Sequence, residues 1–211
     1  MPTCEDLVRD EIVKWGRSLF ERGLTSGSSG NISAKVDGGY IATPTNSCMG
    51  FLDPARLSKI SPEGEHISGD TPTKELPLHL AFYNKRADCG AVVHLHSSYA
   101  TALSCLADTP SENAIPPITP YVVMRAGPVP IVPYRKPGSE EAGVHVSSVA
   151  ADHSAVLIAN HGPIATGKDL PSAVFAIEEI EEAAKLVLIT RGMNVRFLSD
   201  ADVNDLNSTF K

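Results

Sequence analysis

The sequence predicts an α/β fold, because segments with helical periodicity alternate with short apolar segments that have the length of buried strands. Segment 155–159 is uninterrupted, and segment 91–93 is an apolar run that ends in His94-Leu95-His96; such runs are typical of buried strands. Amphipathic stripes over 4–23 and 170–191 predict long helices near the two ends of the chain. With 211 residues, of which 42% are hydrophobic, we expect one domain spanning residues 1–211.

Charge and cysteine content exclude several classes of protein. A net charge of −7 argues against general affinity for nucleic acid or for an anionic membrane. The sequence contains no apolar run of membrane-spanning length, and its N-terminus has no pattern of a signal peptide. None of its four cysteines is in a CxxC pair, so we expect reduced thiols in a cytoplasmic protein.

The first helix is expected over 4–23, with Thr3 as its N-cap and Gly23 as its stop. The loop that follows, 25–31, is rich in glycine and serine. Glycine permits close approach of a ligand to the backbone, and successive N–H groups in such a loop can bind an anion. The alternative interpretation of this loop is an ordinary flexible turn.

A β-hairpin is expected next, with strands over 32–36 and 40–43. A small polar loop, 43–47, follows it, and short strands are expected at 57–60 and at Ile67.

A helix preceded by Thr73, Lys74 and Glu75 is expected to run to about Asn84. Glu75 suits the positive end of the helix dipole, so a surface acid is the alternative to a catalytic one. His79 lies one turn later, where a packed histidine is a simpler interpretation than a metal ligand.

The second half of the chain predicts further alternation of strands and helices. We expect helices over 98–105 and 139–151, and short strands over 121–125 and 129–132. In the last helix, four acids are interpreted as a solvated face without chemistry: Glu178, Glu179, Glu181 and Glu182.

Three histidines stand where apolar strands end, namely His94, His96 and His161. Residues two apart on a strand point to the same face, so His94 and His96 are expected to project together. Strand ends are where α/β sheets gather their sites, and three histidines with an open position form a catalytic zinc pattern. The alternative is a set of surface or hydrogen-bonded histidines, which is the interpretation given to His66, His145 and His153.

Five short motifs occur in an order and spacing that resemble the class II aldolase/adducin family: 30–33, 43–45, 73–75, 94–96 and 160–162. The resemblance extends over about residues 5 to 198. It implies α-β-α layers with a central, mostly antiparallel sheet flanked by helices. It also implies a homo-oligomer, a tetramer with active sites between subunits.

The resemblance also implies roles for individual residues. His94, His96 and His161 would hold one Zn²⁺ per subunit, or another divalent metal, and Glu75 would be the acid/base residue. Tyr121 would donate a proton in a neighbouring subunit's site. The substrate and its phosphate would be bound by Ser28, Gly30, Asn31, Thr45, Asn46, Thr73 and Lys74.

Within the family, segments 43–50, 52–54 and 119–125 look most like the branch that decarboxylates 3-oxo-tetronate 4-phosphate. Such an enzyme forms dihydroxyacetone phosphate and CO₂ through a metal-stabilised enediolate. Lys74 or Arg125 would meet the substrate carboxylate, although an interface salt bridge is the simpler role for Arg125. The alternatives are an aldolase cleaving a ketose phosphate of the L-fuculose-1-phosphate type, a pentulose-phosphate 4-epimerase, a non-catalytic adducin-like scaffold and a Schiff-base enzyme using Lys74.

Overall fold

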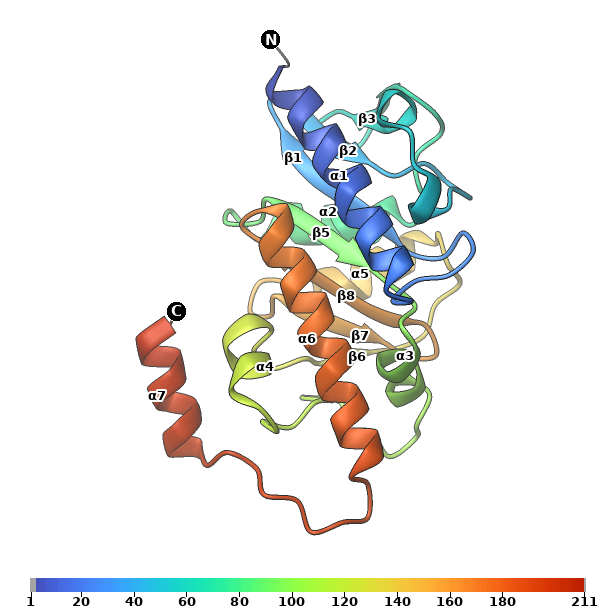
Figure 1. Ribbon diagram of the computed structural model, residues 1–211. Coiled ribbons are helices and arrows are strands. Elements are labelled where there is room, and N and C mark those ends of the chain that lie inside the picture. The colour runs from blue at the N-terminus through green and yellow to red at the C-terminus, as the bar shows by residue number, and fades with distance from the viewer. Residues whose placement is uncertain (1–2, 211) are drawn as a thin grey trace.

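A computed structural model describes residues 3–210 of the chain. Its strands form one eight-stranded sheet in the order β4-β3-β2-β1-β5-β8-β7-β6 (Figure 1). Neighbouring strands pair antiparallel except β6 and β7, which are parallel. The predicted mostly antiparallel sheet is therefore confirmed. The strands are β1 (Asn31–Val36), β2 (Gly39–Ala42), β3 (Ser58–Ile60), β4 (His66–Ser68), β5 (Ala91–His94), β6 (Ile131–Val132), β7 (Ala155–Ile158) and β8 (Gly162–Gly167).

Helices cover both faces of this sheet, as the α-β-α prediction requires. Side chains of α1, α3, α4 and α6 share one core with the sheet, and side chains of α2 and α5 share a second. Strand β5 serves both cores, because Ala91 and Val93 belong to the first and Val92 to the second. The helices are α1 (Cys4–Glu21), α2 (Leu76–Lys85), α3 (Ser98–Ser104), α4 (Pro120–Arg125), α5 (Glu140–Ser147), α6 (Leu170–Ile189) and α7 (Asp200–Phe210), with short 3₁₀ turns at Met49–Phe51 and Pro54–Arg56.

Three elements differ from the sequence prediction: α4, β8 and α7. The segment 121–125 is part of helix α4 and not a strand. The Thr119 side chain accepts the N–H of Val122, and Pro120 occupies the first turn, so this segment carries ordinary helix-start signals. Strand β8 follows β7 directly after a tight turn, and its glycine and proline content hides it from a strand pattern. Helix α7 lies at the end of a long connection and packs beside α4 (Figure 1).

The acidic stretch of α6 is not uniformly solvated, so the prediction for Glu181 is wrong. Its side chain is buried, and its two carboxylate oxygens accept the backbone N–H groups of Tyr99 and Ala100. Glu182, in contrast, is exposed, as predicted. The carboxylate of Glu181 therefore caps α3 from a different helix.

Over residues 3–210, the helices are too short or too polar to cross a membrane. All four cysteines are free thiols. Burial raises the pKa of the Cys89 thiol to about 11, so this side chain stays protonated in the core.

Candidate active site

Strand β5 directs His94 towards the sheet face that α2 covers. Because residues two apart share a face, His94 lies on the same side as Val92, which belongs to the α2–α5 core. His96 follows the strand, and its Nε2 atom lies 3.2 Å from the Nε2 atom of His94. The predicted projection of both imidazoles to one side is therefore present.

His161 reaches the same point from the tight turn between β7 and β8. Asn160 has φ 54° and Gly162 has φ 145°, conformations that asparagine and glycine adopt with the least strain. A Cβ atom on Gly162 would come within 2.4 Å of the Leu95 carbonyl oxygen, so only glycine fits there. The turn brings Nε2 of His161 to 3.3 Å from Nε2 of His94.

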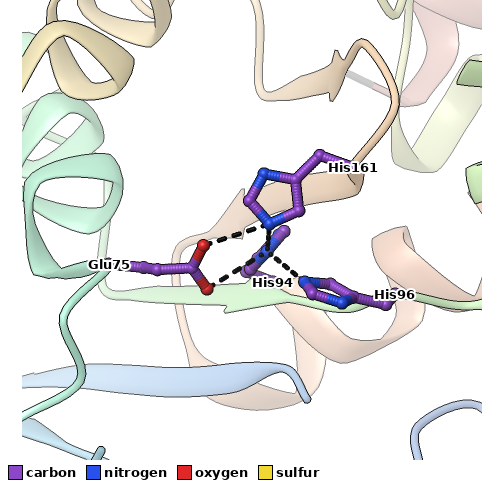
Figure 2. A group of neighbouring side chains, drawn as sticks. All are labelled: Glu75, His94, His96 and His161. Atoms are coloured by element: carbon purple, nitrogen blue, oxygen red, sulfur yellow. Dashed lines mark hydrogen bonds and ion pairs between the residues drawn. The ribbon is translucent and has the colours of Figure 1, made fainter. Parts of the chain in front are cut away.

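Glu75 immediately precedes helix α2 and completes the cluster. Its Oε1 atom lies 3.0 Å from Nε2 of His161, and its Oε2 atom lies 3.5 Å from Nε2 of His94. Figure 2 shows the carboxylate and the three imidazoles converging from three places: His94 and His96 from the end of β5, His161 from the β7–β8 turn, and Glu75 from the start of α2. One ligand-type atom from each of the four residues lies within 4.8 Å of all the others.

The donor set fits a divalent transition metal. Nδ1 of His94 lies 2.8 Å from the Pro163 carbonyl oxygen, so it carries the proton and leaves a lone pair on Nε2. A backbone partner of this kind is typical of histidines that bind metals. The Oε1 atom of Glu75 is buried without a hydrogen bond of normal geometry. Three imidazole nitrogens and a carboxylate are ligands that suit Zn²⁺ and other divalent first-row transition metals. Metal binding by these residues stays a prediction.

Electrostatics favour the protonation states that such a ligand set needs. Burial would raise the pKa of Glu75, but contact with His161, the potential of His94 and the amide of Asn31 outweigh it and lower this pKa. Burial lowers the pKa of His94 to about 3. An ionised carboxylate and a neutral imidazole are therefore the states expected near neutral pH.

A cavity of about 230 Å³ opens beside the cluster, with Glu75 and His96 in its wall. All seven residues predicted to bind the substrate and its phosphate line this cavity. Three further lining residues were not predicted: Ser29, Pro44 and Pro137. Ser29 and Pro44 lie within the motifs already singled out, whereas nothing in the sequence indicated Pro137.

Loop geometry explains both the small, polar lining of the cavity and the position of Pro137. Gly30 has φ 78°, and a Cβ atom there would lie 3.0 Å from the His94 carbonyl oxygen, so glycine lets this loop touch β5. Asn46 also adopts a positive φ, of 55°. Gly138 has φ 82° and packs against Lys74, where an added Cβ would lie 3.2 Å from that residue's Cβ. Because Gly138 packs closely against Lys74, the preceding residue, Pro137, lies in the wall of the cavity.

Two residues considered for the site, Tyr121 from the resemblance and Arg125 as a partner for a substrate carboxylate, do not line the cavity of their own chain. Tyr121 is 55% exposed on α4, and its role in a neighbouring subunit stays a prediction. The guanidinium of Arg125 lies over the Phe175 ring at 5.6 Å, so it is engaged away from the site. His79 is a fully buried helix histidine, as expected.

Comparison with known proteins connects this arrangement to a family. The family model for the class II aldolase and adducin N-terminal domain matches residues 10–188. A 3-oxo-tetronate 4-phosphate decarboxylase from Pectobacterium atrosepticum is 50% identical over 97% of this chain and 94% of the relative. An L-fuculose phosphate aldolase from Escherichia coli is 33% identical over 95% of this chain and 93% of its own length.

Solved structures give the same relationship. YgbL from Escherichia coli superposes with a TM-score of 0.94 at 46% identity, covering 97% of this chain and 99% of that one. An L-fuculose 1-phosphate aldolase superposes with a TM-score of 0.86 at 28% identity, over 100% and 98% of the two chains. Family model, sequence relatives and structures agree, and the chain belongs to the class II aldolase and adducin family.

Proposed function

We propose that this chain is a metal-dependent carbon–carbon lyase that decarboxylates 3-oxo-tetronate 4-phosphate to dihydroxyacetone phosphate and CO₂. The observation that carries the proposal is the convergence of Glu75 and three histidines beside a cavity lined by small polar loops. It is supported by five relatives named for this reaction, which are 40–50% identical over 97–99% of the chain.

The two ends of the substrate require different surroundings. Its phosphate suits the loops around Gly30 and Thr45, where backbone N–H groups, hydroxyls and positive-φ turns offer anion contacts. Its carboxylate requires a cation, and Lys74 lies in the wall of the same cavity. The phosphate thereby anchors the molecule while the reacting carbons lie towards Glu75 and His96.

The chemistry breaks one bond and forms another. The bond between C1 and C2 breaks, CO₂ leaves, and the electron pair passes from C2 towards the ketone oxygen on C3. His94, His96 and His161 would hold a divalent metal, which would supply Lewis-acid stabilisation of that negative charge. C2 must then receive one proton, which we assign to Glu75 after uptake from solvent, with Tyr121 of a neighbouring subunit as the second candidate.

We further infer that the metal is Zn²⁺, one per subunit, and that the chain works in the cytoplasm as a homotetramer with active sites between subunits. The nitrogen-rich donor set supports zinc. The exposed Tyr121 supports sharing of sites, because a side chain that does not line its own cavity is free to line a neighbour's.

A second candidate is an aldolase that cleaves a ketose phosphate into dihydroxyacetone phosphate and an aldehyde. The 33% identity to the L-fuculose phosphate aldolase favours it. The chemistry is also similar, because decarboxylation and aldol cleavage each leave an electron pair on the carbon next to a ketone. A pentulose-phosphate 4-epimerase would use the same bond cleavage. A non-catalytic scaffold is disfavoured, because all four residues of the cluster are present and converge.

Product analysis by NMR decides between these candidates. The zinc-loaded protein is incubated separately with 3-oxo-tetronate 4-phosphate, L-fuculose 1-phosphate and a pentulose phosphate. We expect CO₂ and dihydroxyacetone phosphate from the first, and no aldehyde from the others. Release of an aldehyde without CO₂ overturns the proposal, and so does a Lys74 adduct trapped by borohydride in a chelator-insensitive reaction.

A further inference from the structure

A line of four hydrogen bonds runs from Glu75 into the protein interior. Nδ2 of Asn31 donates to Oε2 of Glu75 at 2.9 Å. Oδ1 of Asn31 lies 2.6 Å from Nε2 of His79, and Nδ1 of His79 lies 2.7 Å from the Ser33 hydroxyl. The Ser33 hydroxyl lies 2.9 Å from the hydroxyl of Tyr83. The substrate-binding loops and the assigned chemistry use only the first two residues of this line.

The line exists because a helix face and a strand face interlock. Glu75, His79 and Tyr83 are spaced by four residues, which places them along one face of α2 and of the N-cap residue that precedes it. Asn31 and Ser33 are spaced by two residues, which places them on one face of β1. The strand residues fill the gaps between the helix residues. His79 and Ser33 are fully buried, so solvent does not compete for their hydrogen bonds.

Each hydrogen-bond donor in this line points towards Glu75. A carboxylate only accepts, so the amide nitrogen of Asn31 faces Glu75 and its oxygen faces His79. Nε2 of His79 must then carry the hydrogen. Burial lowers the pKa of His79 to about 4, so the ring is neutral and Nδ1 is an acceptor. Ser33 therefore donates to Nδ1 and accepts from Tyr83, whose pKa burial raises.

We propose that His79 is a positioning residue, which, with Ser33 and Tyr83 behind it, holds the Asn31 amide as a donor to Oε2 of Glu75. The role of Glu75 itself rests on the proposed function. With Oε2 held by Asn31, Oε1, which lies 3.0 Å from Nε2 of His161 and has no hydrogen bond of normal geometry, is the oxygen left for a metal or a proton. Without a donor from His79, the Asn31 amide can rotate by half a turn and place its oxygen against the carboxylate.

Two substitutions of His79 separate positioning from simple packing. In His79→Gln, the side-chain amide nitrogen can occupy the place of Nε2 and donate to Asn31. In His79→Asn, the shorter side chain reaches only the place of Nδ1. We expect His79→Asn to weaken Zn²⁺ affinity by about 10–100-fold, the usual effect of losing a partner behind a metal ligand. We expect His79→Gln to stay within about 3-fold of the unsubstituted protein.

Zn²⁺ affinity is measured by competition with a chromophoric chelator, with His66→Asn on exposed strand β4 as the matched control. If His79→Asn cannot be purified as folded protein, Ser33→Ala serves instead, because it removes the donor to Nδ1 and frees His79 to change tautomer. Equal affinities for all these variants, with circular dichroism showing intact folds, would overturn the proposal. So would an equal loss in His79→Gln and His79→Asn.

The direction of the line is tested without reference to activity. Neutron diffraction from deuterium-exchanged crystals of the metal-free protein locates the exchangeable hydrogens. We expect deuterium on Nε2 of His79, and Ser33 and Tyr83 hydroxyls pointing towards Nδ1 and Ser33, respectively. Deuterium on Nδ1 of His79 contradicts the proposal even if CO₂ is released. Failure to release CO₂, with the expected hydrogens in place, contradicts only the proposed function.

Discussion

The carboxylate of Glu181, in the middle of α6, accepts the backbone N–H of Tyr99 at 2.9 Å. Its second oxygen accepts the N–H of Ala100 at 2.8 Å. These N–H groups belong to the first turn of α3, where a helix has no internal partners for them. Because α3 begins two residues after His96, Glu181 anchors the segment that carries a candidate metal ligand.

Replacing Glu181 with alanine leaves these N–H groups without their charged acceptor. We expect the free energy of unfolding to fall by about 2–4 kcal/mol. Urea denaturation followed by circular dichroism measures the change. The matched control is Glu182→Ala, one residue along the helix and exposed, which should change stability by less than about 0.5 kcal/mol. Equal effects of the two substitutions would show that Glu181 stabilises the fold no more than a solvated side chain does.

Removing one imidazole should disable the metal site without unfolding the chain. We expect His161→Ala to weaken Zn²⁺ binding by more than about 100-fold. This is a larger loss of affinity than is usual for replacing a residue that only hydrogen-bonds to a metal ligand. Isothermal titration calorimetry measures this affinity. His66→Ala, on exposed strand β4, should bind Zn²⁺ like the unsubstituted protein. Unchanged affinity in His161→Ala would remove His161 from the site.

Gly162 should tolerate no side chain, because its backbone and its surroundings both exclude one. A Cβ atom would lie 2.4 Å from the Leu95 carbonyl oxygen, and φ is 145°. We expect Gly162→Ala to cost more than about 3 kcal/mol and to weaken Zn²⁺ binding through the displaced His161. Gly192 has φ 80° in open space, so Gly192→Ala isolates the backbone cost of about 1–2 kcal/mol. Thermal unfolding should rank the two variants in this order.

The metal-free protein should lose stability as the pH falls from about 6.5 to 4.5. Burial lowers the pKa of His79 to about 4 and that of His94 to about 3, so in this range only the unfolded state protonates them. Stability is then fully present above the ordinary histidine pKa and falls by roughly 1.4 kcal/mol per pH unit for each buried histidine. Urea denaturation across this range measures the slope. His79→Gln should reduce it, and His66→Gln should not.

The candidate site was predictable where its signals are local. His94 and His96 follow from the strand period, His161 ends a second apolar strand, and Glu75 opens a helix. The small, polar composition of loops 25–31 and 43–47 also marked them as candidate binding loops. These signals lie within a few residues and mark the histidines, whereas the roles of Glu75 and of the loop residues were implied by the resemblance to the family.

The features that sequence reasoning missed depend on tertiary contacts. Glu181 has the same composition around it as the exposed Glu182, and only the position of α3 makes it a buried acceptor. The line from Asn31 through His79 to Tyr83 requires the register of α2 against β1. Pro137 enters the cavity because Gly138 packs on Lys74, a contact without a sequence pattern.

The most direct test of the central claim uses 3-oxo-tetronate 4-phosphate labelled with ¹³C at the carboxyl carbon. ¹³C NMR follows the label with the native, chelator-treated and zinc-restored protein, against spontaneous decarboxylation without protein. We predict labelled CO₂ in equal amount to dihydroxyacetone phosphate, lost on chelation and regained with Zn²⁺. Release no faster than the spontaneous rate, or release unaffected by chelation, would contradict a metal-dependent decarboxylase.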